Sequence, residues 1–294
     1  DGHNVSVIDT QWFGNHLKPH DRLKVIKADV RDFTEAHFAG IETVIHLANI
    51  ANDPSVDLNP VLSWEVNVLA SEQLASMARK QGVRQIIFAS SGSVYGLNDA
   101  EKVTENLPLV PISVYNKTKM VAERVFLSFA ADMKIHIIRP ATVCGLSDRM
   151  RFDLSVNMLT YQALENGRIT VFGGKQVRPN IHIDDLVEVY CHFLSNRDLD
   201  TGCYNAGFEN LSILNIAEMA KAAIDAEIVI TKSNDPRSYR QNSDKLLATG
   251  FTPKFGVNKA ITDLCTAYRD QNLRAKPEDY TVNWMKELKL NEGA

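Results

Sequence analysis

The sequence lacks the features that mark several classes of protein. Its four cysteines form no CxxC pair and no metal-binding spacing with histidine, and no apolar run is long enough to cross a bilayer. The 32 Lys and Arg residues are scattered among 36 Asp and Glu residues, for a net charge of −4. We therefore expect no metal, no membrane and no nucleic-acid partner, and reduced thiols in a cytoplasmic protein.

The first half of the chain instead shows the pattern of a parallel, doubly wound α/β sheet. Short apolar segments rich in Val and Ile alternate with helical stretches, as expected for strands that are covered on both faces. The predicted strands are 5–8, 23–28, 43–46, 85–89 and 135–138. With 294 residues, the chain is long enough for two unequal lobes around a substantial core.

The pattern changes near residue 149. A helix is expected over 151–166, then a strand and turn over 169–174, a strand and helix over 181–194, and a strand at Tyr204. A helical stretch over 211–225, a strand over 227–231 and a helix near 257–273 follow. We predict a dinucleotide-binding domain over 1–150, to which 179–206 returns, and a mainly substrate-binding domain over 151–294.

Two patterns in the middle of the chain carry chemistry. Tyr115 and Lys119 are four residues apart, so they share one face of a helix. Free tyrosine titrates near pH ~10, and a nearby ammonium lowers that pKa so that the phenolate can act as a base. A serine cluster at 90–93 lies a short way upstream, where Ser91 offers a hydroxyl to hold the substrate oxygen. These groups predict hydride removal from a carbinol onto a nicotinamide.

These motifs resemble those of the extended short-chain dehydrogenases/reductases, the nucleotide-sugar epimerases and dehydratases. The matching segments run along nearly the whole chain in the family's order. They are 5–9, 28–32, 44–48, 88–96, 138–145, 178–185 and 203–207. The resemblance implies a Rossmann-type sheet with a smaller C-terminal α/β substrate lobe, and an NAD-dependent reaction on a nucleotide sugar.

The resemblance assigns the catalytic roles to Ser91, Tyr115 and Lys119, and no metal. In the opposing interpretation Tyr115 is an ordinary helix residue and Lys119 a solvated charge, because a Tyr and a Lys at this spacing also occur by chance. The serine motif and the preceding βαβ pattern favour the catalytic interpretation. Ser93 is then a candidate substrate contact.

The cofactor candidates lie mainly at strand ends. A carboxylate at Asp9 would bind the ribose hydroxyls of adenosine and repel a 2′-phosphate, which favours NAD over NADP. Alternatively, Asp9 starts a turn and Asp29 caps a helix. We interpret His46 as a core histidine. The implied cofactor contacts are Asp9, Asp29, Val30, Leu47, Ala48, Asn49, Asn67, Tyr115 and Lys119.

The substrate candidates include two arginines. Residues matching Arg178 and Arg237 hold the diphosphate of the nucleotide sugar in the family, and the guanidinium fork suits phosphate oxygens. The alternatives are a surface position for each and an ion pair of Arg237 with Asp235. Asn157 is a further candidate phosphate contact, and Thr142 stands where the family usually has Asn. The stretch 149–153 resembles a segment of one subgroup of sugar epimerases.

Together the motifs predict a nucleotide-sugar epimerase that acts at C4 through a 4-keto intermediate. A 4-dehydrogenase or ketoreductase of the same fold is one alternative, and a non-catalytic nucleotide-sugar-binding homologue is another. A dehydratase is disfavoured, because Gly92 and Ser93 stand where the 4,6-dehydratases have an Asp-Glu pair. By resemblance we also expect a homodimer through the helices at 61–81 and 115–131.

The family's first strand and glycine-rich turn have no match in the sequence. The chain begins at a turn into the strand that ends at Asp9, and in dinucleotide-binding folds that acid follows the glycine motif by about 20 residues. We therefore expect a fragment that lacks a central strand. Residues 1–294 alone are then expected to be neither stable nor competent for NAD.

Overall fold

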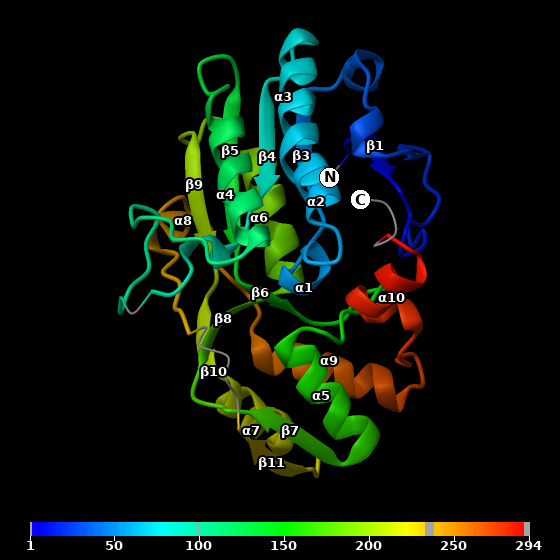
Figure 1. Cartoon of the computed structure of the whole chain (residues 1–294), viewed down its shortest axis with the longest axis vertical. Helices are drawn as coiled ribbons and strands as arrows, with labels where there is room; N and C mark the ends of the chain where they lie inside the picture. Colours follow the sequence, from blue (N-terminus) through cyan, green and yellow to red (C-terminus); the bar gives the residue numbers. More distant parts are fainter. Residues whose placement is uncertain (1, 99, 233–237, 291–294) are drawn as a thin grey trace.

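The structure is a computed structural model that describes residues 2–98, 100–232 and 238–290 (Figure 1). Six strands form the parallel part of the fold. They are β1 (Val5–Asp9), β2 (Leu23–Lys27), β3 (Thr43–His46), β4 (Gln85–Ala89), β5 (Lys134–Pro140) and β9 (Gly202–Ala206). β1 pairs with β2, and the other four are hydrogen-bonded in the order β3-β4-β5-β9, all in parallel. The predicted doubly wound sheet is thus confirmed.

Helices cover this sheet on its two faces. The covering elements are α1 (Asp53–Val56), α2 (Pro60–Trp64), a π-helical turn (Glu65–Leu69), α3 (Ala70–Lys80), α4 (Val114–Leu127) and α6 (Ile183–Ser195). The rings of Phe88 in β4 and Phe126 in α4 pack in the core with their centres 4.7 Å apart and their planes tilted by 38°. His46 is 4% exposed, and burial lowers its pKa to about 3, so it is the core histidine that the sequence predicted.

The sheet is in two parts among the described residues. β1 pairs only with β2, and β3 pairs only with β4. On the facing edges, Val5 is 46% and Ile45 39% exposed. The central strand that the resemblance places between β1 and β3 stays a prediction.

The second lobe contains two small sheets. In one, β8 (Val177–His182) lies between the parallel strand β6 (Thr142–Cys144) and the antiparallel strand β10 (Glu209–Ser212). In the other, β7 (Arg168–Phe172) pairs in parallel with β11 (Glu227–Thr231). The helices of this lobe are α5 (Ser155–Asn166), α7 (Ile213–Ala223), α8 (Asp244–Leu247), α9 (Val257–Arg269) and α10 (Thr281–Glu287).

The structure corrects the bounds of the helix predicted over 151–166. That helix begins only at Ser155, because the chain before it is held by an ion pair between Arg151 and Asp153. One hydrophobic core contains residues of β4, β5, α6 and β9, and the return of 179–206 to the first domain stays a prediction. The division into two domains otherwise stays a prediction.

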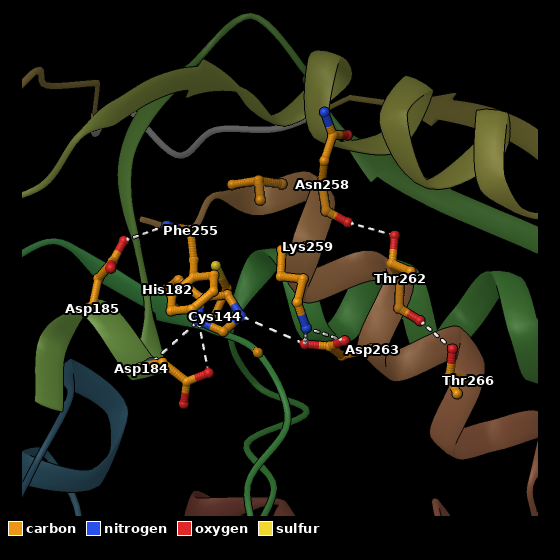
Figure 2. Close-up of polar contacts among 12 residues, drawn as sticks. Cys144, His182, Asp184, Asp185, Phe255, Asn258, Lys259, Thr262, Asp263 and Thr266 are labelled. Carbon is orange, nitrogen blue, oxygen red and sulfur yellow. Dashed lines mark hydrogen bonds and ion pairs between the residues drawn. The ribbon is translucent and has the colours of Figure 1, made fainter. Parts of the chain in front are cut away.

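A polar junction fixes α9 to the start of α6 (Figure 2). The Asp185 carboxylate is fully buried and accepts hydrogen bonds from the backbone N–H groups of Lys254 and Phe255, both at 2.9 Å. Nδ1 of the buried His182 accepts from the N–H of Asp184 at 3.2 Å, and its Nε2 lies 3.9 Å from Asp263. The segment that leads into α9 is thus attached to α6 through one carboxylate.

We expect Asp185→Ala to destabilise the protein by about 2–5 kcal/mol, because two backbone donors lose a charged acceptor in the interior. Urea unfolding monitored by circular dichroism measures the change. Asp184→Ala is the matched control: its side chain is 60% exposed, so its loss should cost less than about 1 kcal/mol. Equal effects of the two substitutions would contradict a structural role for Asp185.

Candidate active site

The serine turn follows directly from the carboxyl end of β4. Ser91 caps a short 3₁₀ helix (Gly92–Tyr95), and its hydroxyl lies 2.8 Å from that of Ser93. Asn116 donates from Nδ2 to Ser93 Oγ at 2.9 Å. Ser91 and Ser93 thus share a hydrogen bond in which either hydroxyl can be the donor, and Ser93 also accepts from Asn116. Ser90 is directed elsewhere, to the buried carboxylate of Glu123.

α4 brings the predicted base to this turn. Ser113 is the N-cap of α4, accepting from the N–H of Asn116 at 3.1 Å, and its hydroxyl donates to Asp53. Tyr115 stands in the first turn of the helix, within hydrogen-bonding reach of Ser91. The structure therefore brings Ser91, Ser93 and Tyr115 together as the sequence predicted.

Lys119 lies one turn further along α4 and is 3% exposed. Its ammonium donates to the carbonyl of Ala89 at 2.6 Å and lies 4.9 Å from the centre of the Phe88 ring. Burial lowers the pKa of Lys119 to about 7, and the negative charge of the neighbouring Glu123 opposes this shift only in part.

The pKa of Tyr115 differs from the expected direction. Burial raises it to about 12, against the lowering effects of the Ser91 hydrogen bond and the charge of Arg151. The prediction that the Lys119 ammonium moves this pKa toward neutrality stays a prediction. The Lys119 ammonium instead donates to the Ala89 carbonyl, and burial disfavours the charged form of the Tyr115 phenol.

Tyr115 lines a cavity of about 520 Å³ between the two lobes. Of the predicted site residues, Ser91, Ser93, Tyr115, Thr142 and Arg178 line it. Arg178 also lies 5.9 Å from the ring centre of Tyr239, a further lining residue. The arrangement combines a proton acceptor, hydroxyl donors and guanidinium groups around one space.

Sequence reasoning missed several polar residues of this cavity. They are Asp53, Asn116, Arg151, Asp153, Gln176 and Tyr239. Only Arg151 and Asp153 had a signal, the charged segment 149–153 before a helix. Asp53 and Tyr239 reach the cavity from distant parts of the chain, which no spacing could show.

The predicted phosphate contacts have different outcomes. Asn157 is 4% exposed, accepts from the N–H of Gly145 at 3.0 Å and donates to the carbonyl of Arg151 at 3.3 Å. It is absent from the residues that line the cavity, and its contact with substrate stays a prediction. Arg237 and its suggested partner Asp235 lie outside the described residues.

The predicted adenosine-ribose contacts lie at the carboxyl ends of β1 and β2, and their roles toward a dinucleotide stay predictions. Asp9 is an exposed carboxylate at the carboxyl end of β1, and its described hydrogen bond is with the N–H of Gln11, at 2.5 Å. Asp29 follows β2 and forms an ion pair with Arg31 at 3.0 Å, while Val30 packs in an apolar cluster. The carboxyl ends of parallel strands meet at one edge, where such ligands bind.

The loop after β3 completes this edge. Leu47 is 57% exposed, and Ala48 and Asn49 are partly buried. Asn67 is buried and holds the loop through two hydrogen bonds. It accepts from the N–H of Ile50 at 2.8 Å and donates to the carbonyl of Ile50 at 3.1 Å. Asn67 also donates to Thr118 of α4 at 3.1 Å. It thus acts here by fixing the loop relative to the catalytic helix.

Two further predictions concern absences. Among the described residues, no group of three or more His, Cys, Asp or Glu side chains is placed to hold a metal ion. No described helix is both long and apolar enough to cross a membrane. The four cysteines are free thiols.

Comparison with known proteins decides the family. Residues 1–207 match the model of the NAD-dependent epimerase/dehydratase family. The chain belongs to this family. It is therefore an NAD-dependent enzyme of the extended short-chain dehydrogenase/reductase type, with NAD as its cofactor.

Individual members of the family are similar over most of the chain. The UDP-glucose 4-epimerase of Corynebacterium glutamicum is 26% identical over 92% of this chain and 87% of its own. The UDP-glucuronic acid decarboxylase 1 of Danio rerio is 25% identical over 89% of this chain and 66% of its own. The solved structure of MoeE5 in complex with UDP-glucuronic acid and NAD superposes with a TM-score of 0.81, at 26% identity over 92% of both chains.

Asp9 gives a test of cofactor choice. We expect Asp9→Ala to weaken NAD binding about tenfold to a hundredfold, because hydrogen bonds to a charged acceptor contribute about 1.5–3 kcal/mol. NADP should bind poorly to the parent and gain relative to NAD in the variant. Calorimetric titration measures both. Asp21→Ala removes an exposed carboxylate at the opposite end of the strands and should change neither affinity. Equal parental affinity for NAD and NADP would contradict the assignment.

Proposed function

We propose that the protein is an NAD-dependent epimerase that inverts C4 of a UDP-hexose through a 4-keto intermediate. The observation that carries this proposal is the chain of hydrogen bonds from Asn116 through Ser93 to Ser91, which ends beside Tyr115 at the wall of the cavity. This arrangement supports a base and a hydroxyl donor that act on one substrate oxygen. The UDP-sugar 4-epimerases among the relatives support the choice of nucleotide and carbon.

Each side chain has a role in this reaction. Tyr115 removes the proton from the 4-hydroxyl, and Ser91 donates a hydrogen bond to the same oxygen as it becomes a carbonyl. When the hydride returns to the other face of the sugar, the proton on Tyr115 goes back to the oxygen. Epimerisation needs both faces of C4 to be presented in turn, and the cavity of about 520 Å³ leaves space for the sugar to turn.

NAD, when bound, supplies a reversible hydride acceptor. Asp9 and Asp29 would hold its adenosine end, and Leu47, Ala48 and Asn49 would line the path to the nicotinamide ribose, with Lys119 beneath it. The Lys119 ammonium donates a hydrogen bond to the Ala89 carbonyl at 2.6 Å. A hydroxyl close to this ammonium would favour its charged form, and the charged form favours the Tyr115 phenolate.

On the substrate side, Arg178 is the proposed diphosphate ligand. It lines the cavity beside Tyr239, whose ring it approaches at 5.9 Å. We further propose a homodimer through the helices at 61–81 and 115–131. In its support, Val61 and Leu69 are large apolar side chains that are 56% and 57% exposed on the first of these segments.

The test is conversion of UDP-glucose into UDP-galactose without net reduction of NAD. Mass spectrometry of the purified protein for retained NAD accompanies it. An epimerase recycles its cofactor, so product should form without stoichiometric NADH. Accumulation of NADH with a keto sugar would instead identify the 4-dehydrogenase alternative. Release of water would identify a dehydratase, for which Gly92 and Ser93 supply no acid-base pair beside Ser91.

A further inference from the structure

Arg151 and Asp153 form an ion pair inside the catalytic cavity. Nε of Arg151 donates to Oδ1 of Asp153 and Nη2 donates to Oδ2, both at 2.8 Å. The side chains are 24% and 23% exposed, and both line the cavity. One edge of the guanidinium fork is therefore filled by a carboxylate of the chain itself.

This pair lines the same cavity as Tyr115. The charge of Arg151 also lowers the pKa of Tyr115. If Tyr115 takes its proton from the 4-hydroxyl, the pair faces the space that holds the ring atoms beside C4. These are C3 and C5, and C5 carries the C6 group. C6 is a hydroxymethyl group in a neutral hexose and a carboxylate in a uronic acid.

Asn52 holds Asp153 from the other lobe. Its Nδ2 lies 3.4 Å from Oδ2 of Asp153, while its Oδ1 accepts from the N–H of Ser55 at 2.9 Å and begins α1. Asn52 has φ 71° and ψ 156°, a region that is almost exclusive to glycine and costs about 1–3 kcal/mol for other residues. A backbone held in this conformation at the cavity wall indicates that the position of its side chain matters.

We propose that Asp153 is a specificity-determining residue that occupies Arg151 and so selects neutral hexoses against uronic acids at this end of the cavity. The inference rests on the proposed C4 reaction. A hydroxymethyl group can be placed beside the neutralised pair without competition. A C6 carboxylate that approaches this pair meets the negative charge of Asp153 beside Arg151, whose cation Asp153 already neutralises through Nε and Nη2. The relatives include proteins named for both kinds of sugar, so the family alone does not decide the choice.

The experiment compares UDP-glucose with UDP-glucuronic acid in calorimetric binding to the NAD-loaded protein, with turnover measured beside it. We expect the parent to bind UDP-glucose at least about tenfold more tightly, since like charges brought together cost several kcal/mol. Asp153→Asn keeps the shape of the side chain but frees the charge of Arg151. It should reduce the preference for UDP-glucose at least about tenfold, mainly through tighter binding of UDP-glucuronic acid.

Two controls separate specificity from general damage. Asp132→Asn removes a carboxylate from an exposed pair with Arg79, outside the cavity, and should leave the preference unchanged. In the double variant Arg151→Gln with Asp153→Asn, the gain for UDP-glucuronic acid should disappear. Thermal melts of all variants show whether they fold.

Each outcome supports or overturns the specificity role of Asp153. A parent that binds UDP-glucuronic acid as tightly as UDP-glucose overturns the proposal without any variant, and so does an Asp153→Asn protein that weakens both ligands equally. If the binding preference shifts as expected but neither sugar is epimerised, the specificity role stands and the proposed function fails. If UDP-glucose is epimerised and the preference does not shift, the proposed function stands and the specificity role of Asp153 fails.

Discussion

Replacing Tyr115 by Phe is expected to reduce turnover at least about a hundredfold, because general acid-base catalysis by one positioned group contributes about 10²–10⁴. The substitution removes a single oxygen, so the apolar contacts of the ring remain. Binding of UDP-glucose should stay within about tenfold of the parent, since only a proton-transfer interaction is lost. Steady-state kinetics and calorimetry on the same preparation measure the two quantities.

A suitable control is Tyr239→Phe. Tyr239 lines the same cavity and approaches Arg178, so its hydroxyl tests whether any phenol in the cavity has the effect. We expect its loss to alter substrate affinity more than turnover. Unchanged turnover in Tyr115→Phe would show that another group accepts the proton.

The sequence predicted the parallel sheet and the proximity of Ser91, Ser93 and Tyr115, and the reason is local. Strands buried on both faces are continuous apolar segments, and Tyr115 and Lys119 are joined by one turn of helix. The family resemblance added the order of the segments. The function of these segments could therefore be inferred from their spacing and order, without knowledge of distant contacts.

The charge environment of the site was not predictable in the same way. The fall in the Lys119 pKa and the rise in the Tyr115 pKa both come first from burial, which depends on how the lobes pack. Asp53 reaches Ser113 across 60 positions, and Asn52 reaches Asp153 across 101. Contacts of this kind arise from topology, and a single sequence contains no period or motif for them.

Replacing Lys119 by Met should separate catalysis from stability. We expect turnover to fall at least about a hundredfold, because the cation that favours a Tyr115 phenolate is lost. Lys117→Met is the control on the same helix, since Lys117 is exposed, and it should retain both activity and stability. A Lys119→Met enzyme with parental turnover would contradict the assignment.

The same substitution should change how stability depends on pH. Burial lowers the pKa of Lys119 from 10.5 to about 7, so between these values the unfolded chain binds a proton that the folded protein does not. The free energy of unfolding of the NAD-stripped parent should therefore rise with pH from about 7 upward, by at most about 1.4 kcal/mol per pH unit for this group. Lys119→Met lacks that slope. Below pH 7 the variant avoids the free-energy cost of burying an ammonium, although the Ala89 carbonyl loses its hydrogen-bond donor. Urea unfolding between pH 6.5 and 9 measures both slopes, and parallel curves would show that Lys119 keeps its usual pKa in the folded protein.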